Sequence, residues 1–130
     1  MSVYSDVLDA VVTLAEQANP YAEILIGPMP PDNGISIAWS SGSLNTFMDK
    51  KATVSASAVL NCKHTDQRVA ADTLGKIHTF LSMKKDYPMA DNFQITSIET
   101  IGIPAYLGRE ENQQYLYGSS LRIKFYLKGE

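Results

Sequence analysis

Two stretches of the chain place apolar residues at the spacing of an amphipathic helix, i, i+4, i+7 and i+11. In the first stretch these positions are Val7, Val11, Leu14 and Ala18, with Leu8 and Ala15 beside them. Ser5 or Ser2 can cap its free amides, and Asp6 suits the positive end of the helix dipole. Asn19 and Pro20 end it, because proline disfavours helical geometry in the preceding residue.

The second helical stretch follows Thr65 and Asp66, which are predicted to cap it. Its apolar positions are Ala70, Leu74, Ile77 and Leu81, reinforced by Val69 and Phe80. Lys84 and Lys85 are expected at the negative end of the dipole, and the Tyr87-Pro88 pair closes the helix.

Between these helices the apolar period changes to two, which predicts strands. Residues 23–26 form a short apolar strand, and the proline-rich residues 27–34 form a turn. Ile35, Ile37 and Trp39 alternate with small polar residues, so a half-buried strand is expected there. Residues 40–49 are predicted to leave this strand as a Ser/Gly loop.

A longer strand follows, in which small residues dominate both faces. Its predicted inner face consists of Ala52, Val54, Ala56, Ala58, Leu60 and Cys62. Side chains this small leave room for a closely packed partner, and a helix lying on the sheet is the expected one.

The last third of the chain is predicted to be β again. Residues 93–103 form a strand in which Ile98 breaks the alternation of Ile95, Ile101 and Ile103, as a bulge or a strand covered on both faces would do. Residues 104–112 are expected to form a polar excursion. The final strand has its apolar face at Tyr115, Tyr117, Leu121, Ile123, Phe125 and Leu127, with Arg122, Lys124 and Lys128 on the solvated side.

The predicted order is therefore α-β-β-β-α-β-β in one domain that spans residues 1–130. Adjacent strands pair most simply as antiparallel hairpins, so an α+β fold is expected: a mostly antiparallel sheet with two helices on one face. The pattern leaves the strand order open.

Composition changes this picture little. A net charge of −3 gives no general attraction for phosphates and argues against a dedicated nucleic-acid binder. The single cysteine, Cys62, cannot form an internal disulfide and is expected to be a small buried hydrophobe. No export signal and no membrane-spanning run is expected from the sequence.

The residues that could carry catalysis do not converge. His64 and His78 are expected at surface or boundary positions, and neither has ligands at metal-binding spacing. Glu110 and Glu111 are adjacent loop carboxylates of the kind that is usually solvated. Phosphate-binding glycine loops and nucleophile elbows are missing from the sequence. No catalytic residue, cofactor or metal is predicted, and the protein is not expected to be an enzyme.

The candidate interface residues instead lie in two segments with apolar content. Residues 40–49, with the preceding Trp39, supply one group, and residues 105–114 supply the other. The predicted contacts are Trp39, Leu44, Phe47, Met48, Tyr106, Leu107, Arg109 and Glu110. The proline-rich residues 27–34 are a third predicted protrusion.

The second half of the chain resembles the minor capsid and tail-terminator proteins of long-tailed bacteriophages. The resemblance rests on residues 101–111 (IGIPAYLGREE), 115–118 (YLYG) and 121–126 (LRIKFY), and the order of helices and strands agrees in outline. It implies a viral structural protein of the virion tail or neck, assembled in the host cytoplasm.

In that family, such a protein forms a ring, a hexamer, that caps the tail tube. Its implied partners are further copies of itself, the major tail tube protein and the head–tail connector or stopper, with phage DNA passing through the lumen without specific binding and no membrane. The family has no catalytic residues to transfer. Two other readings remain open: a head-completion or stopper protein of the neck, and a small α+β ligand-binding or enzymatic domain.

Overall fold

The computed structural model describes residues 3–28, 33–46, 52–84, 86–87, 90, 92–110 and 113–127, with the backbone alone at 43–46. The elements are α1 (Val3–Ala15), a 3₁₀ turn η1 (Glu16–Ala18), β1 (Ile24–Ile26), β2 (Ile35–Thr46), β3 (Ala52–His64), α2 (Gln67–Ser82), β4 (Phe93–Arg109) and β5 (Tyr115–Leu127). The predicted α+β class and element order are confirmed.

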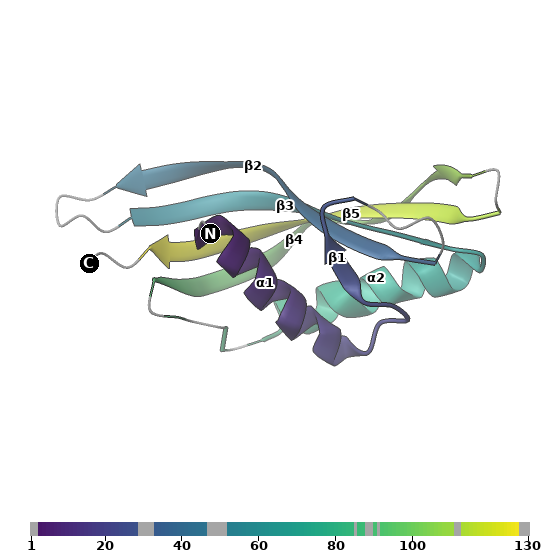
Figure 1. The fold of residues 1–130 in the computed structure, drawn as a ribbon, viewed down its shortest axis with the longest axis horizontal. Coiled ribbons are helices and arrows are strands. Elements are labelled where there is room, and N and C mark those ends of the chain that lie inside the picture. The colour runs from purple at the N-terminus through teal and green to yellow at the C-terminus, as the bar shows by residue number, and fades with distance from the viewer. Residues whose placement is uncertain are drawn as a thin grey trace.

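The five strands form one sheet in the order β1-β2-β3-β5-β4. All neighbouring pairs are antiparallel except β1 and β2, which run parallel. Figure 1 shows both helices on one face of this sheet, with the β2–β3 end reaching past α1 at one end of the molecule and the β4–β5 end beside the end of α2 at the other. The result is an elongated, twisted sheet with one helix-covered face and one open face.

Helix α1 buries the predicted stripe except for Ala18, which is half-buried in η1. The α-helix ends at Ala15, earlier than predicted, and η1 continues the helical backbone to the predicted end before Asn19. Asn19 adopts the left-handed conformation (φ 57°), and its backbone N–H caps the carbonyl of Glu16. Asparagine tolerates this conformation better than most residues, so it suits the end of a helix. The predicted cap at Ser5 is wrong, because Ser5 lies inside α1, and Ser2 lies outside the described residues.

Helix α2 starts as predicted. The Asp66 carboxylate accepts hydrogen bonds from the backbone N–H groups of Arg68 (3.0 Å) and Val69 (3.3 Å). The helix ends at Ser82, and Lys84 follows with its Nζ 4.8 Å from the centre of the Phe80 ring. Lys85 and Pro88 lie outside the described residues.

The core lies between the helices and the inner face of β3 and β5. Burial along β3 alternates as predicted, and Phe125 of β5 is fully buried. The Tyr4 ring of α1 meets Phe125 edge-on at 5.8 Å, and Cys62 donates a hydrogen bond from Sγ to the carbonyl of Ala70 in α2 at 3.4 Å. The small inner side chains of β3 therefore do accommodate helices, as expected.

Two predicted loops are wrong because both segments continue strands. Residues 40–46 belong to β2, which resumes pairing with β3 after a register shift between Trp39 and Ser41. Residues 104–109, predicted as an excursion, belong to β4. Strand pairing satisfies the backbone groups of these polar segments, so their lack of apolar alternation does not prevent a strand.

The predicted irregularity near Ile98 is confirmed as a bulge, since the β4–β5 register shifts between Ile95 and Ser97. Ile98 is buried, whereas Ile101 and Ile103 are 45% and 76% exposed. Assigning these two isoleucines to the core alternation was wrong, because β4 has three further register shifts after Thr100.

Cys62 is buried, as the sequence predicts, and burial makes its thiol unreactive. Its loss of hydration raises the pKa of the thiol from its ordinary 9.0 to about 11. We expect iodoacetamide to leave the native thiol intact at pH 8 and to alkylate it once guanidinium unfolds the chain. Folding favours the protonated thiol. The contribution of Cys62 to the stability of the fold is therefore fully present below pH 9 and is lost as the pH rises towards 11. Rapid alkylation of the native protein would contradict this assignment.

Candidate interaction surfaces

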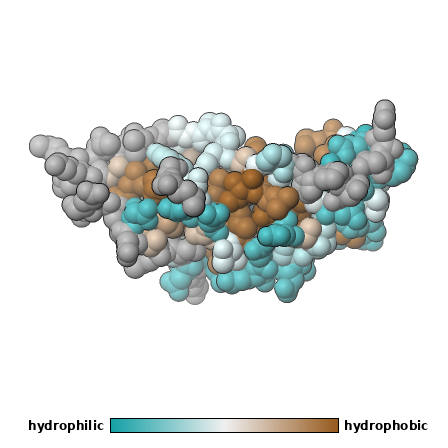
Figure 2. Space-filling model, viewed as in Figure 1, coloured by the Kyte–Doolittle hydropathy of each residue, from teal (hydrophilic) through white to brown (hydrophobic). Residues whose placement is uncertain are grey.

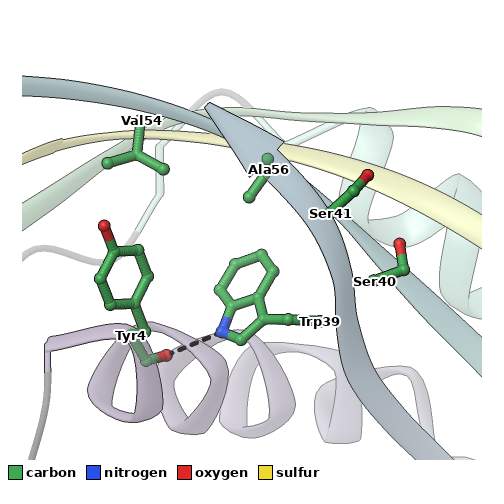
Figure 3. Close-up of a pocket in the computed structure, with 7 residues that line it drawn as sticks. Tyr4, Trp39, Ser40, Ser41, Val54 and Ala56 are labelled. Carbon is green, nitrogen blue, oxygen red and sulfur yellow. Dashed lines mark hydrogen bonds between the residues drawn. The ribbon is translucent and has the colours of Figure 1, made fainter. Parts of the chain in front are cut away.

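Trp39 sits over a hollow between α1 and the paired strands β2 and β3 (Figure 3). Its indole Nε1 donates to the backbone carbonyl of Tyr4 at 3.2 Å, and its ring centre lies 6.0 Å from that of Phe125. The hollow measures about 350 Å³ and is lined by Tyr4, Trp39, Ser40, Ser41, Gly42, Val54 and Ala56. Trp39 is thus half-buried against the core, and its ring forms one wall of a shallow apolar hollow.

Gly42 lets β2 pass close to β3 at the edge of this hollow. A Cβ added to Gly42 would lie 2.8 Å from the Cβ of Ala56 and 2.9 Å from its Cα. We expect Gly42→Ala to lower the free energy of unfolding by about 1–3 kcal/mol, because the paired backbone has to shift. Gly75→Ala in α2 is the matched control: nothing lies within 4 Å of the added methyl, and a gain of about 0.5–1 kcal/mol is expected. Urea unfolding measures both, and equal effects would contradict the close approach.

The other predicted contacts near Trp39 are placed only in part. Leu44 lies in β2, where its backbone pairs with Val54. Its side chain is not described, and Phe47, Met48 and residues 29–32 of the proline-rich segment lie outside the described residues. Their role as contacts stays a prediction.

The outer part of the β4–β5 hairpin carries the second predicted group. Tyr106 and Leu107 are 53% and 62% exposed. The ring centre of Tyr106 lies 5.7 Å from that of Tyr117, on the side of the sheet that bears the helices. Leu107 lies on the other side, over Gly118, where an added Cβ would be only 2.7 Å from its Cδ1. The hairpin therefore exposes an aromatic ring on one face and an aliphatic side chain on the other.

The two charged residues of the predicted group, Arg109 and Glu110, are both engaged. The Arg109 guanidinium lies 5.6 Å from the centre of the Tyr115 ring, a cation–π distance. Glu110 accepts a hydrogen bond from Nζ of Lys63 at 3.0 Å, and this lysine of β3 is buried. The sequence predicted Glu110 as a solvated loop carboxylate; in the structure it anchors the hairpin to β3.

Exposed apolar side chains that the sequence analysis did not single out lie on the two edge strands. Leu25 and Ile26 of β1 are 38% and 41% exposed, and Ile101 and Ile103 occupy the opposite edge on β4. Figure 2 shows a hydrophobic surface in the middle of the view, over β1. The run of three consecutive apolar residues at 24–26 was the signal in the sequence for exposed apolar side chains. A strand that buries one face hides only alternate residues, so one of three in a row has to lie on the other face.

Each of the two histidines has its Nδ1 within hydrogen-bonding distance of a partner. His78 is buried, and its Nδ1 lies 2.8 Å from Oγ1 of Thr100; loss of hydration lowers its pKa. The predicted surface or boundary position of His78 is therefore wrong. His64 lies at the end of β3 as predicted, and its Nδ1 accepts from the N–H of Asp66 at 2.9 Å.

Within the part of the chain that the structure describes, no three His, Cys, Asp or Glu residues group as metal ligands would. Over the same residues, none of the helices has both the length and the apolarity that a membrane span needs.

A scan of the sequence against protein-family models and a search of the curated proteins match nothing. A search of solved structures does find matches. One is a chain of the "Virion of native gene transfer agent (GTA) particle", with a TM-score of 0.60 and 11% sequence identity. The match covers 95% of this chain and 98% of the virion chain. The two chains share a fold. Because nearly all of both chains is matched, the likeness extends to the whole arrangement of helices and sheet.

Proposed function

We propose that this protein is a structural component of a phage-like virion, and specifically a ring that caps the tail tube and joins it to the neck. The observation that carries the proposal is the fold match to a chain of a gene transfer agent virion over almost the full length of both chains. The resemblance of residues 101–126 to tail-terminator proteins supports the finer assignment.

The surfaces described above suit such a role. Exposed apolar side chains gather on the protruding hairpin and on the sheet edges, where a partner could cover them. The described histidines, cysteine and buried lysine are all engaged in structural contacts. Action through surfaces, without catalysis, is therefore the function we infer.

A ring can end tube growth by simple geometry. Head-to-tail contacts between identical subunits close when their rotation permits, and they then leave no free lateral surface. One face of the ring would match the end of the tube, and the opposite face would present different residues. A further tube subunit then finds no matching surface, and polymerisation stops.

The test is tube growth in the presence of the purified protein. With the partner tube protein, we expect added protein to bind tube ends and to stop elongation at substoichiometric amounts, as seen by electron microscopy. A variant with Phe47→Ser and Tyr106→Ser should lose this effect, and Met83→Ser, at an exposed site next to α2, should keep it. Unchanged tube growth together with binding to purified portal would overturn the tail assignment and favour a neck stopper.

A further inference from the structure

Six of the eight large apolar side chains exposed on the described residues lie on the two edge strands of the sheet. On β1 they are Leu25 and Ile26, and on β4 they are Ile101, Ile103, Tyr106 and Leu107. Edge strands also present backbone groups without a neighbouring strand. On β1 one of these groups, the N–H of Ile24, donates to Oε2 of Glu16 at 3.3 Å. Each copy of the protein thus has two apolar edges that face in opposite directions.

The two apolar edges lie at the same level of the sheet. Residue pairing connects β1 to β4 in one row across all five strands: Ile24, Ile35, Cys62, Tyr117 and Tyr106. The next row connects Leu25 to Ala105 in the same way, through Ser36, Asn61 and Gly118. A copy placed beside the first in the plane of the sheet would meet it without a shift along the strands.

Charge is divided unevenly along the sequence. Residues 1–49 contain six acidic and no basic residues, and residues 50–130 contain eleven basic and eight acidic ones, so the net charges are −6 and +3. Glu23 is exposed beside β1, and among the described residues no ion pair involves residues 3–28. The carboxylates of Glu99 and Glu110, near β4, are instead paired with lysines.

Arg109, at the end of β4, is the cation placed to meet Glu23 of a neighbour. Glu23 comes just before Ile24, so it lies toward the rows of paired residues that end on β4 at Gly108 and Arg109. In these rows Leu116 pairs with Gly108 and Tyr115 pairs with Arg109. Neighbouring copies in the plane of the sheet would also run β1 antiparallel to β4, since β1 is parallel to β2 and each later pair is antiparallel. Apolar contact, charge and strand direction therefore agree.

We propose that the β1 edge of one copy docks on the β4 edge of the next, with Glu23 facing Arg109, and that this is the lateral contact of the assembled ring. The inference rests on the ring proposed above and names its subunit interface. The contact is head-to-tail and joins two edges that share the same rows of paired residues, so it needs no shift in register, and it closes into a ring where the rotation between copies permits.

Disulfide trapping tests the contact even where association is weak. The variant with Glu23→Cys and Arg109→Cys should form a ladder of covalent oligomers on oxidation, read on a non-reducing gel, while either single variant should stop at dimers. Within one copy the two sites are separated by four strand spacings, about 19 Å, too far for a disulfide. Native Cys62 is fully buried and does not interfere.

The matched control replaces an exposed acid and an exposed base that lie on the helices, Asp9→Cys with Arg68→Cys. It should give no ladder beyond dimers under the same conditions. An equal ladder from this control, or dimers alone from the edge pair, would overturn the proposed contact.

Charge exchange gives an independent readout. Glu23→Arg and Arg109→Glu should each weaken self-association roughly tenfold or more, because like charges then meet. An equimolar mixture of the two variants, or the double variant, should regain it, since every contact is again between opposite charges. Failure of both combinations to recover, with the single variants impaired, would overturn the pairing.

The outcomes separate this inference from the proposed function. If the wild-type protein caps tubes but edge variants behave like the wild type, the contact is wrong and the function stands. If edge variants alter self-association but no variant affects tubes or tail length, the contact stands and the capping role is wrong.

Discussion

Replacing Phe125 with alanine is expected to lower the free energy of unfolding by about 3–5 kcal/mol, the largest effect of any single substitution considered. Phe125 is fully buried near the C-terminal end of β5, opposite Val54 of β3 and Ile95 of β4. Its ring also meets those of Tyr4 and Trp39. Truncation therefore removes the side chain that connects the sheet to the start of α1 and leaves a cavity beneath the Trp39 hollow.

The measurement is urea unfolding followed by tryptophan fluorescence. Trp39 is the only tryptophan, so its emission reports directly on the ring that loses its partner, and a shift to longer wavelength is expected in the native variant. Phe125→Leu is the conservative control and should cost less, because most of the buried volume is kept. Ile103→Ala, at a site that is 76% exposed, should change stability by less than about 0.5 kcal/mol. A loss below about 1 kcal/mol for Phe125→Ala would contradict this account of the core.

Removing the Glu110 carboxylate is expected to lower the free energy of unfolding by about 1–3 kcal/mol, because the ammonium group of Lys63 is then buried without its partner. The side chain of Lys63 is 7% exposed and that of Glu110 is 39% exposed, so water reaches one side of the pair and keeps the loss below that of a fully buried one. Glu110 also closes the β4–β5 turn, since its N–H donates to the carbonyl of Gln114 at 2.8 Å. Glu110→Ala should therefore loosen the hairpin that carries Tyr106 and Arg109.

Two comparisons identify the cause of this loss. The double variant Lys63→Met with Glu110→Ala should recover most of the stability, because the unpaired charge is gone. Glu99→Ala breaks the other described ion pair, with Lys124, in which the groups are 3.6 Å apart and 43% to 49% exposed. That change should cost less than about 1 kcal/mol. Thermal and urea unfolding measure all three, and equal losses for Glu110→Ala and Glu99→Ala would mean that burial of Lys63 does not matter.

The sequence by itself determined those elements whose apolar residues recur at the period of a helix or a strand and are also the residues that are buried. The stripe of α1, the Asp66 cap of α2 and the inner faces of β3 and β5 were all predicted and are all present. These features depend on neighbours within four residues or on strict alternation, so a single segment specifies them. They were enough for the fold class and for the place of the core.

The tertiary structure alone decided where strands continue and which side chains reach the surface. Residues 40–46 and 104–109 form strands because pairing partners exist on β3 and β5, which the local sequence cannot show. The register shifts of β4 then break the alternation that the sequence suggests, and Ile101 and Ile103 are exposed. Strand order, finally, places β1 and β4 at opposite edges, and it brings Ile24 and Tyr106, 82 positions apart in sequence, into one row. Edges and rows are properties of long-range pairing, so they follow only from the assembled sheet.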